Sequence, residues 1–268
     1  MVNENANDKQ KHPKYPVQTL GKALDIIEIL YENGTGEGLG ITELSQRLGI
    51  GKSTIHRSLD TLVSYGYVER ISDSSKYCLG WRIFEIGNIV PRQRNLYNFD
   101  INILQDLCNK HKETINLGVR VEGDVITISK IEPPITLMAN LQIGGREAVH
   151  ATAMGKVLIS EHTKEQLIEI IGEKNFKSYT PNTITSIDAL VEELETIRNQ
   201  GYSIDDEEFC LGLFCIAMPV RNYKNEIVAA VSVSGPSVRL NFSKVMEIRK
   251  DLEEATSKLS TYFGCKAE

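Results

Sequence analysis

The sequence predicts a protein of mixed helices and strands, an α/β chain of the α+β type, with a small helical head and a larger body. Two observations lead to this prediction. Residues 41–62 have the apolar spacing of two short helices, and residues 65–80 have that of a β-hairpin. From residue 114 onward, short apolar strands recur between helical segments. The length of 268 residues allows one large or two ordinary domains.

The composition is that of an ordinary globular protein. Hydrophobic residues make up 41% and charged residues 25% of the chain. No apolar run approaches the roughly 20 residues that span a bilayer. Residues 1–16 are polar and lack the apolar core of a signal peptide. We therefore expect a disordered lead-in over 1–16, no membrane partner and a cytoplasmic location.

Neither the cysteines nor the histidines indicate a metal site. The five cysteines are an odd number without a Cys-x-x-Cys pair, which argues against a disulfide framework and a zinc module. The five histidines show no metal-ligand spacing among themselves. The sequence therefore predicts no metal and no cofactor, and the cysteines are expected to be small core residues.

The first half of the helical hairpin, residues 41–48, is predicted to be a supporting helix. Leu44 and Leu48 lie one helical turn apart, and Thr42 is placed to cap the helix start. Gly49 and Gly51 follow within three residues, which suits a turn that reverses the chain direction quickly.

The second half of the hairpin is predicted to be a helix with one apolar and one polar side. Ser53 is placed to cap it, and Ile55, Leu59 and Leu62 recur at helical spacing. The other side carries small hydroxyl groups and basic groups, which is typical of a helix that reads DNA. The hairpin alone supports two interpretations about equally. It is either a DNA-reading motif or a pair of helices without a binding function.

The segments around the hairpin favour DNA binding. A helix is predicted over 19–33, and the hairpin of strands after the second helix turns at 72–75. Three helices followed by a β-hairpin form a winged helix-turn-helix, whose second motif helix enters the major groove of double-stranded DNA. The predicted DNA-binding residues are Thr42, Lys52, Ser53, Thr54, His56, Arg57 and Lys76.

The distribution of charge agrees with a DNA-binding head. The net charge is −6, but residues 1–95 hold 12 basic and 11 acidic residues, whereas residues 96–268 hold 18 and 25. An acidic body with a near-neutral head suits a protein whose DNA contacts are confined to a small patch.

A linker is predicted between the head and the body. Residues 81–90 have helical spacing, and Pro91 is expected to stop or kink the helix before a polar junction over 92–95. Two roles explain this linker helix equally well. It either makes dimer contacts or forms a packed connection to the next helix, 98–112. The expected organisation is a winged helix-turn-helix domain over 17–80, a linker helix over 81–97 and a larger domain over 98–268.

The body is predicted to be an α+β domain with a small-molecule site. The two-residue period of a strand over 227–233 extends to place Ser232 and Ser234 on one face, where two hydroxyls can donate to a carboxylate. Residues 153–156 follow a loop and are expected at a helix N-terminus, which favours anions. Strands are expected at 115–119, 125–131, 137–143 and 215–220, and helices at 164–171, 187–199 and 242–263.

Plainer explanations exist for these residues. Small residues on a buried strand often serve close packing alone, and Met154 is explained equally well as core or as pocket. The run 205–208 is expected to be mostly a solvated acidic turn, with only Asp205 in the site. His150 and Cys215 resemble a base and a nucleophile, but no third partner stands at a known spacing and a cysteine in an apolar strand is usually inert. The chain is therefore predicted not to be an enzyme.

Six motifs in order resemble the IclR family of bacterial transcriptional regulators, over nearly everything from 17 to 263. The resemblance implies a winged-helix domain, a linker helix and a GAF-like effector domain, in dimers or tetramers that respond to small, often carboxylated metabolites. The motifs are 41–45 with 52–54, 150–156, 179–185, 201–208, 212–217 and 232–236. By resemblance, the effector contacts fall on Ala153, Met154, Gly155, Asp205, Leu213, Cys215, Ser232 and Ser234.

The chain departs from the family at Arg146-Glu147-Ala148, where members often have apolar residues or proline. These two charged residues either alter the mouth of the pocket or pair with each other in solvent. The predicted function is a sequence-specific regulator that binds an imperfectly palindromic operator as a homodimer or homotetramer, with a repressor favoured and an activator as an alternative. The expected effector is a small carboxylate or sugar acid. A metabolite-binding enzyme and a scaffold without ligands are the alternatives.

Overall fold

The computed structural model describes residues 15–34, 37–93, 96, 99–134, 142–172 and 176–265. The chain forms two compact units, Met1–Gln93 and Arg94–Glu268. The predicted lead-in falls almost wholly outside the described residues. Among the helices that the structure describes, none is both long and apolar enough to cross a membrane.

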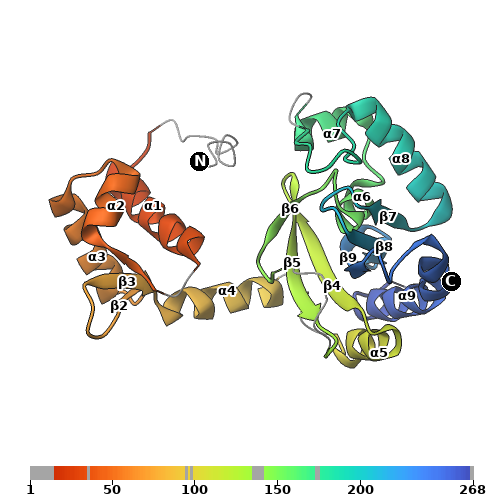
Figure 1. Cartoon of the computed structure of the whole chain (residues 1–268), viewed down its shortest axis with the longest axis horizontal. Helices are drawn as coiled ribbons and strands as arrows, with labels where there is room; N and C mark the ends of the chain where they lie inside the picture. The colour runs from red at the N-terminus through yellow and green to blue at the C-terminus, as the bar shows by residue number, and fades with distance from the viewer. Residues whose placement is uncertain are drawn as a thin grey trace. The chain divides into compact units, whose positions relative to one another are not determined.

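The first unit is a winged helix-turn-helix, as predicted (Figure 1). Its helices pack around a core of aliphatic residues, with a small antiparallel sheet of strand order β1-β3-β2. The helices are α1 (Gln18–Asn33), α2 (Ile41–Leu48) and α3 (Lys52–Ser64), and the strands are β1 (Leu39–Gly40), β2 (Val68–Arg70) and β3 (Lys76–Leu79). The buried core consists of Ile26, Leu30, Leu39, Leu44, Ile55, Leu59, Leu62, Val68 and Tyr77.

The two predicted N-caps of the hairpin are wrong. Helix α2 begins after Gly40, whose N–H donates to the Glu43 carboxylate at 2.7 Å, and Thr42 lies inside the first turn. Helix α3 begins after Gly51, without a side-chain cap, so Ser53 is its second residue. Glycine is nearly as favourable at an N-cap as the hydroxyl residues, so each helix starts earlier than the hydroxyl residues indicate.

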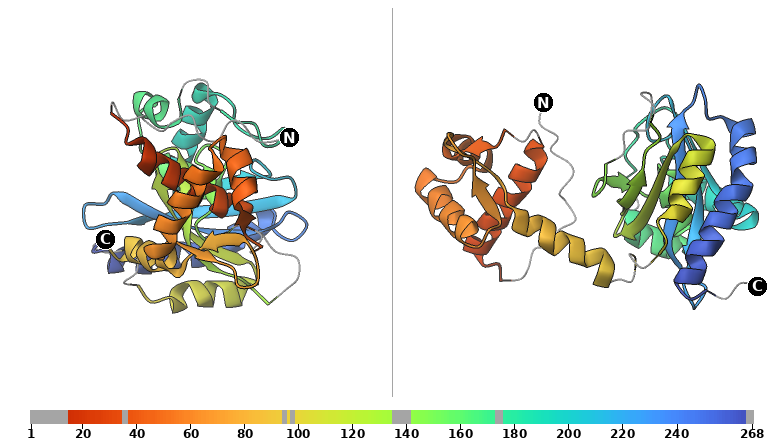
Figure 2. Two further views of the ribbon diagram at one scale, coloured as in Figure 1. Left: turned by 90° about the vertical axis from the view of Figure 1, so that its left-hand side faces the viewer. Right: turned by 90° about the horizontal axis from the view of Figure 1, so that it is seen from below.

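Helix α4 (Trp81–Gln93) leaves the winged domain and continues through Pro91 (Figure 2). Of the two effects expected of Pro91, a stop or a kink, the stop is wrong, because a proline so near the C-terminus removes only one of the last backbone hydrogen bonds. None of its side chains is buried within the chain, and Trp81 and Phe84 are 71% and 61% exposed. The predicted polar junction lies partly in this helix and partly outside the described residues.

The second unit is built on a six-stranded antiparallel sheet with the order β6-β5-β4-β9-β8-β7. The prediction of an α+β domain is confirmed. A strand over 137–143 is not observed: 137–141 lie outside the described residues, and 142–143 are not in a strand. The strands are β4 (Thr114–Val121), β5 (Asp124–Ile131), β6 (Arg146–Ala148), β7 (Ser203–Asp206), β8 (Leu213–Arg221) and β9 (Ile227–Pro236).

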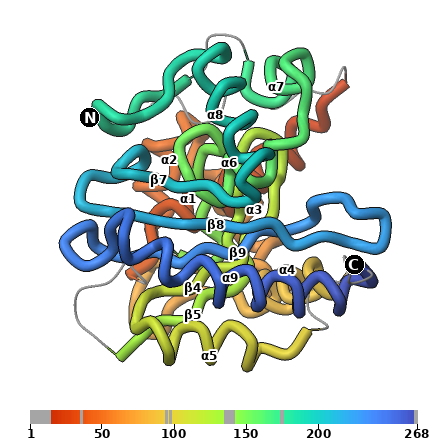
Figure 3. Tube along the Cα trace, turned by 90° about the vertical axis from the view of Figure 1, so that its right-hand side faces the viewer, coloured from red at the N-terminus to blue at the C-terminus, as the bar shows by residue number. Residues whose placement is uncertain are grey.

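Helices cover both faces of this sheet (Figure 3). On one face, α5 (Asn102–His111) and α9 (Phe242–Tyr262) lie side by side over a large aliphatic core. On the other, α6 (Ala153–Ile159) packs on the strands, with α8 (Ile187–Gln200) and α7 (Lys164–Ile171) outside it. The alternation predicted for β9 is confirmed, because Val231 and Val233 join the first core and Ala230 joins the second.

Candidate effector pocket and DNA-reading surface

Helix α3 presents a polar face to solvent because Ile55 and Leu59 anchor its other side in the core with no exposed surface. Arg57 is exposed, and its guanidinium has no ion pair or hydrogen bond among the residues that the structure describes. His56 is also exposed, but its Nδ1 lies 3.0 Å from Oδ2 of Asp60, one turn along the helix. The Arg57 guanidinium is thus available to contact another molecule.

The other predicted DNA-binding residues surround this face. Lys52 and Ser53 are exposed in the first turn of α3, and Thr54 beside them is half-buried. Thr42 is exposed on α2, and Lys76 is half-buried at the start of β3, next to the turn of the wing. The winged domain therefore brings all of these residues to its helix-turn-helix and wing.

A pocket of about 250 Å³, including the solvent at its mouth, opens between α6 and the sheet of the second unit. It contains every predicted effector residue except Gly155, and it adds three residues that sequence reasoning did not place in the site: Glu147, Thr152 and Phe209. Its lining residues are Glu147, Thr152, Ala153, Met154, Asp205, Phe209, Leu213, Cys215, Ser232 and Ser234.

Gly155 has a packing role instead of a place in the pocket wall. A Cβ atom at this position would lie 2.4 Å from both Cα and O of Val149, so only glycine allows α6 to approach this backbone. The helix is only seven residues long. The case for an anion site at its N-terminus therefore rests on side chains around the pocket.

The strongest polar feature of the pocket is the serine pair on β9. Ser232 and Ser234 lie on one face of the strand with their hydroxyls 3.3 Å apart, and both are buried. Behind them, Nδ2 of Asn116 on β4 donates to the Ser232 hydroxyl at 3.2 Å and to the Ser234 hydroxyl at 3.3 Å. Because Asn116 occupies an acceptor site on each oxygen, the serine protons are left to donate to each other, from Ser234 to the Cys215 sulfur, or into the pocket.

Asp205 contributes a buried carboxyl group from β7. It is 1% exposed, and its Oδ1 accepts the backbone N–H groups of Glu208 at 2.7 Å and Phe209 at 3.3 Å. Burial, and after it the charge of Glu208, raise the pKa of Asp205 to about 7. This carboxyl group is therefore divided between its neutral and charged forms near neutral pH.

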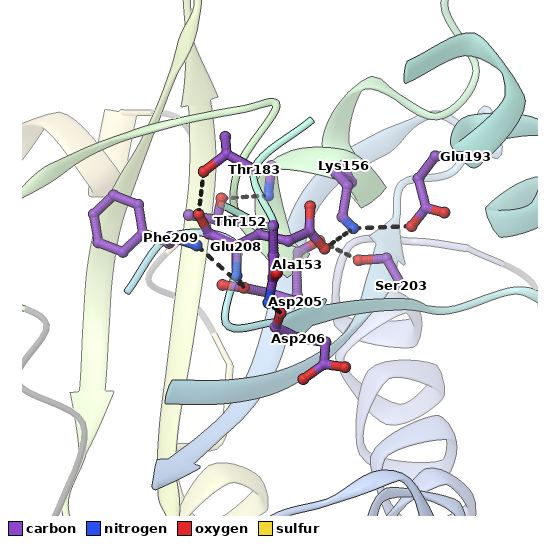
Figure 4. Close-up of polar contacts among 12 residues, drawn as sticks. Thr152, Ala153, Lys156, Thr183, Glu193, Ser203, Asp205, Asp206, Glu208 and Phe209 are labelled. Atoms are coloured by element: carbon purple, nitrogen blue, oxygen red, sulfur yellow. Dashed lines mark hydrogen bonds and ion pairs between the residues drawn. The ribbon is translucent and has the colours of Figure 1, made fainter. Parts of the chain in front are cut away.

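The expectation of a solvated acidic turn at 205–208 is wrong for Glu208. Its Oε1 lies 2.6 Å from Nζ of Lys156, which also pairs with Glu193 on α8 at 2.9 Å (Figure 4). Lys156 is 1% exposed. Burial lowers its pKa, but the charges of Glu208 and Glu193 outweigh burial and raise it, so the ammonium group stays charged. This buried cation ties the loop that carries Phe209 to α6 and α8.

Glu147 and Arg146 do not pair with each other. Arg146 reaches Asp124 on the neighbouring strand at 3.1 Å, at the protein surface. Glu147 turns the other way, is 5% exposed and lines the pocket. Burial raises the pKa of Glu147 to about 7. The sequence signal for the place of Glu147 in the pocket was its charge, because the family often has an apolar residue at this position.

The geometry around Cys215 argues against a nucleophile. Burial, and after it the charge of Asp205, raise the pKa of the Cys215 thiol well above its usual value, so it stays protonated. His150 points elsewhere: its Nε2 lies 3.0 Å from the Lys177 carbonyl, and its ring packs against Phe176. Within the described residues, no group of three histidine, cysteine or acidic side chains is arranged to hold a metal ion.

A winged helix-turn-helix joined to a domain with a small polar pocket defines the class of DNA-binding transcriptional regulators. The chain belongs to the IclR family of that class. The IclR helix-turn-helix domain matches residues 19–72, and the bacterial transcriptional regulator IclR C-terminal domain matches residues 92–261. The relatives are named as regulators, and this chain is a regulator of transcription rather than an enzyme.

Individual relatives resemble the chain over nearly its full length. The HTH-type transcriptional regulator KdgR of Escherichia coli is 34% identical over 257 residues, which cover 96% of each chain. The transcriptional repressor IclR of Escherichia coli is 32% identical over 92% of this chain and 90% of its own. The crystal structure of the Thermotoga maritima IclR has a TM-score of 0.75 and 27% identity, and covers 93% of this chain and 100% of that one.

Proposed function

We propose that the protein is a repressor whose DNA binding is controlled by a small carboxylic or sugar acid. The observation that carries the effector class is the serine pair of β9, whose protons are available to a carboxylate because Asn116 donates to both oxygens. The repressor role is supported by relatives that are named repressors.

In this proposal, residues 17–80 bind the operator, 81–97 link the two functions and 98–268 bind the effector. Arg57 contacts base edges or phosphates, and Lys52, Ser53 and Thr54 hold phosphates near the start of α3. A homodimer, or a homotetramer built from it, places two α3 helices on successive major grooves of an imperfect palindrome. Exposed apolar side chains on α1 and α4 support self-association: Leu20, Leu24, Trp81 and Phe84.

The effector is expected to act on DNA affinity through the linker. The experiment for the proposal as a whole is a thermal-shift screen against small organic and sugar acids, followed by gel shifts with DNA from upstream of the gene. An acid that raises the melting temperature and releases this DNA is the expected result. Tighter DNA binding with the acid would contradict release by the effector, and turnover of an acid without DNA would favour an enzyme.

Replacing Arg57 by alanine is expected to weaken operator binding by about 1–3 kcal/mol if the side chain reads a base. The physical reason is that its guanidinium is exposed and has no partner among the described residues. A gel-shift titration measures the loss, and Lys250→Ala, an exposed position on α9, controls for the change in net charge. Equal loss on unrelated DNA would assign Arg57 to phosphates, and unchanged affinity would remove it from the interface.

Replacing Ser234 by alanine is expected to weaken binding of the acid by about 1.5–3 kcal/mol while leaving operator affinity unchanged. One hydroxyl donor to the carboxylate is lost, and the substitution removes a single buried oxygen. Isothermal titration measures the acid, and a gel shift measures the operator. Ser257→Ala on the exposed side of α9 is the matched control. Loss of both activities together would assign Ser234 to packing.

A further inference from the structure

Glu147 places a carboxyl oxygen without a partner in the wall of the effector pocket. It lies on β6, at one edge of the sheet, and its side chain faces the pocket instead of solvent. Its Oε2 is buried and has no hydrogen-bond partner among the residues that the structure describes. A buried polar atom of this kind destabilises the unliganded protein, so its occurrence requires an explanation.

The nearby cations do not supply the missing partner. Arg146 is the next residue along β6, but its guanidinium pairs with Asp124 at the surface. Lys156 is held between Glu193 and Glu208. The other polar groups that line the pocket are the Cys215 thiol, the Asp205 carboxyl group and the hydroxyls of Thr152, Ser232 and Ser234, and none of them is a partner of Glu147 Oε2. This oxygen is therefore open to a hydrogen bond from a molecule in the pocket.

The two walls of the pocket therefore offer different hydrogen-bonding groups to a ligand. Ser232 and Ser234 on β9 offer donors, whereas Glu147 on β6, separated from β9 by β5 and β4 in the sheet order, offers an acceptor. A ligand that satisfies both walls carries a carboxylate and a separate donor. A hydroxyl group offers one donor to the single unpartnered oxygen, whereas an ammonium group has three N–H donors to satisfy.

We propose that Glu147 is a specificity-determining residue that accepts a hydrogen bond from a hydroxyl group of the effector, and so selects small hydroxy acids over acids without hydroxyls. The serine pair holds the carboxylate of the same molecule. This inference rests on the proposed function of the pocket as an acid site. It adds that Glu147 determines which acids the pocket binds most tightly.

Burial of the Glu147 carboxyl group lowers the stability of the unliganded protein, and this loss supports a role in ligand binding. Burial raises the pKa of Glu147 to about 7, well above its usual value near 4.5. The folded protein therefore binds a proton that the unfolded chain releases, and stability falls as pH rises from about 4.5 through about 7. Glu147→Gln is expected to raise the melting temperature of the unliganded protein at pH 8 and to change it little at pH 5. The other titratable groups that line the pocket with Glu147 are Asp205 and Cys215, and both are unchanged in this variant.

The test compares acids that differ only in their hydroxyl groups. Isothermal titration is performed on the full chain with gluconate and hexanoate, with threonate and butyrate, and with glycerate and propionate. The wild-type protein is expected to prefer the hydroxy acid of at least one pair by about tenfold or more. Glu147→Leu, which lacks the acceptor, is expected to lose that preference, and Glu147→Gln, whose amide oxygen still accepts, is expected to keep most of it. Arg146→Gln, on the same strand but outside the pocket, is the matched control.

Each outcome bears on the inference. A preference that survives in Glu147→Leu would overturn it, as would tighter binding of 4-aminobutyrate than of every hydroxy acid. If wild type and Glu147→Leu bind both members of each pair equally, the inference fails while the acid site stands. If wild type binds operator DNA but none of these acids, the proposed effector class fails and the inference fails with it.

Discussion

Replacing Lys156 by methionine is expected to destabilise the effector-binding unit by about 3–5 kcal/mol. The ammonium group is 1% exposed and lies 2.6 Å from Glu208 and 2.9 Å from Glu193. Without it, the Glu208 carboxylate stays buried with no compensating charge, and desolvation is no longer offset. Urea unfolding followed by far-ultraviolet circular dichroism measures the change, and Phe209 should leave the pocket wall as its loop loosens.

Two comparisons separate charge from packing at Lys156. Burial already raises the pKa of Glu208, and loss of the Lys156 charge raises it further. The deficit of Lys156→Met is therefore largest at alkaline pH and shrinks as pH falls and Glu208 takes up a proton. Lys164→Met, which removes an exposed pair with Asp188, should cost less than about 1 kcal/mol. A stability loss at Lys156 as small as this control would contradict a buried ion pair.

Replacing Gly155 by alanine is expected to cost about 3 kcal/mol and to close or distort the effector pocket. The added Cβ would lie 2.4 Å from two backbone atoms of Val149 and 2.7 Å from Oγ1 of Thr152. Backbone atoms of a buried residue cannot move aside locally, so α6 shifts as a whole, together with Ala153 and Met154. The measurements are urea unfolding and acid binding by isothermal titration.

Gly87 is the matched control for this substitution. It lies in α4, and a Cβ atom added there would meet no neighbouring atom within 4 Å, so Gly87→Ala should stabilise its helix by about 0.5–1 kcal/mol. If Gly155→Ala unfolds at the same urea concentration as wild type, the close approach of α6 to Val149 does not exist in solution.

The predictions that were confirmed depend on local patterns along the chain. Helical spacing predicted α2 and α3, and the two-residue period predicted which face of β9 holds Ser232 and Ser234. The helices predicted at 187–199 and 242–263 are also confirmed, and the side-chain oxygens of Ser186 and Asn241 cap them by accepting from the N–H groups of Ala189 and Lys244 in the first turn. Such features need only neighbours a few residues away, so a single sequence contains their causes.

The predicted N-caps Thr42 and Ser53 and the helix stop at Pro91 failed on local features. The other failures concern partners far away in the chain. The sequence around Glu208 predicts a solvated side chain because nothing near it is basic, yet its partner Lys156 is 52 residues earlier. Strand β7 was not predicted, because four residues with two aspartates form a strand only through pairing with β8. The exposure of Trp81 and Phe84 could likewise not be predicted from the sequence, because helical spacing indicates an apolar face but not which residues cover it.

The amino-acid sequence by itself determined the class of this protein: a winged helix-turn-helix, a helical linker and a pocket domain with two serines on one strand face. Periodicity and turn chemistry are local and predicted the helices and strands, while the resemblance of six motifs to the IclR family implied the linker and the effector domain. Only the tertiary structure decided that Glu147 turns into the pocket while Arg146 pairs at the surface. It also decided that Lys156 is a buried cation. Burial and ion pairing depend on segments that meet only in the fold, and these segments set the electrostatics of the pocket.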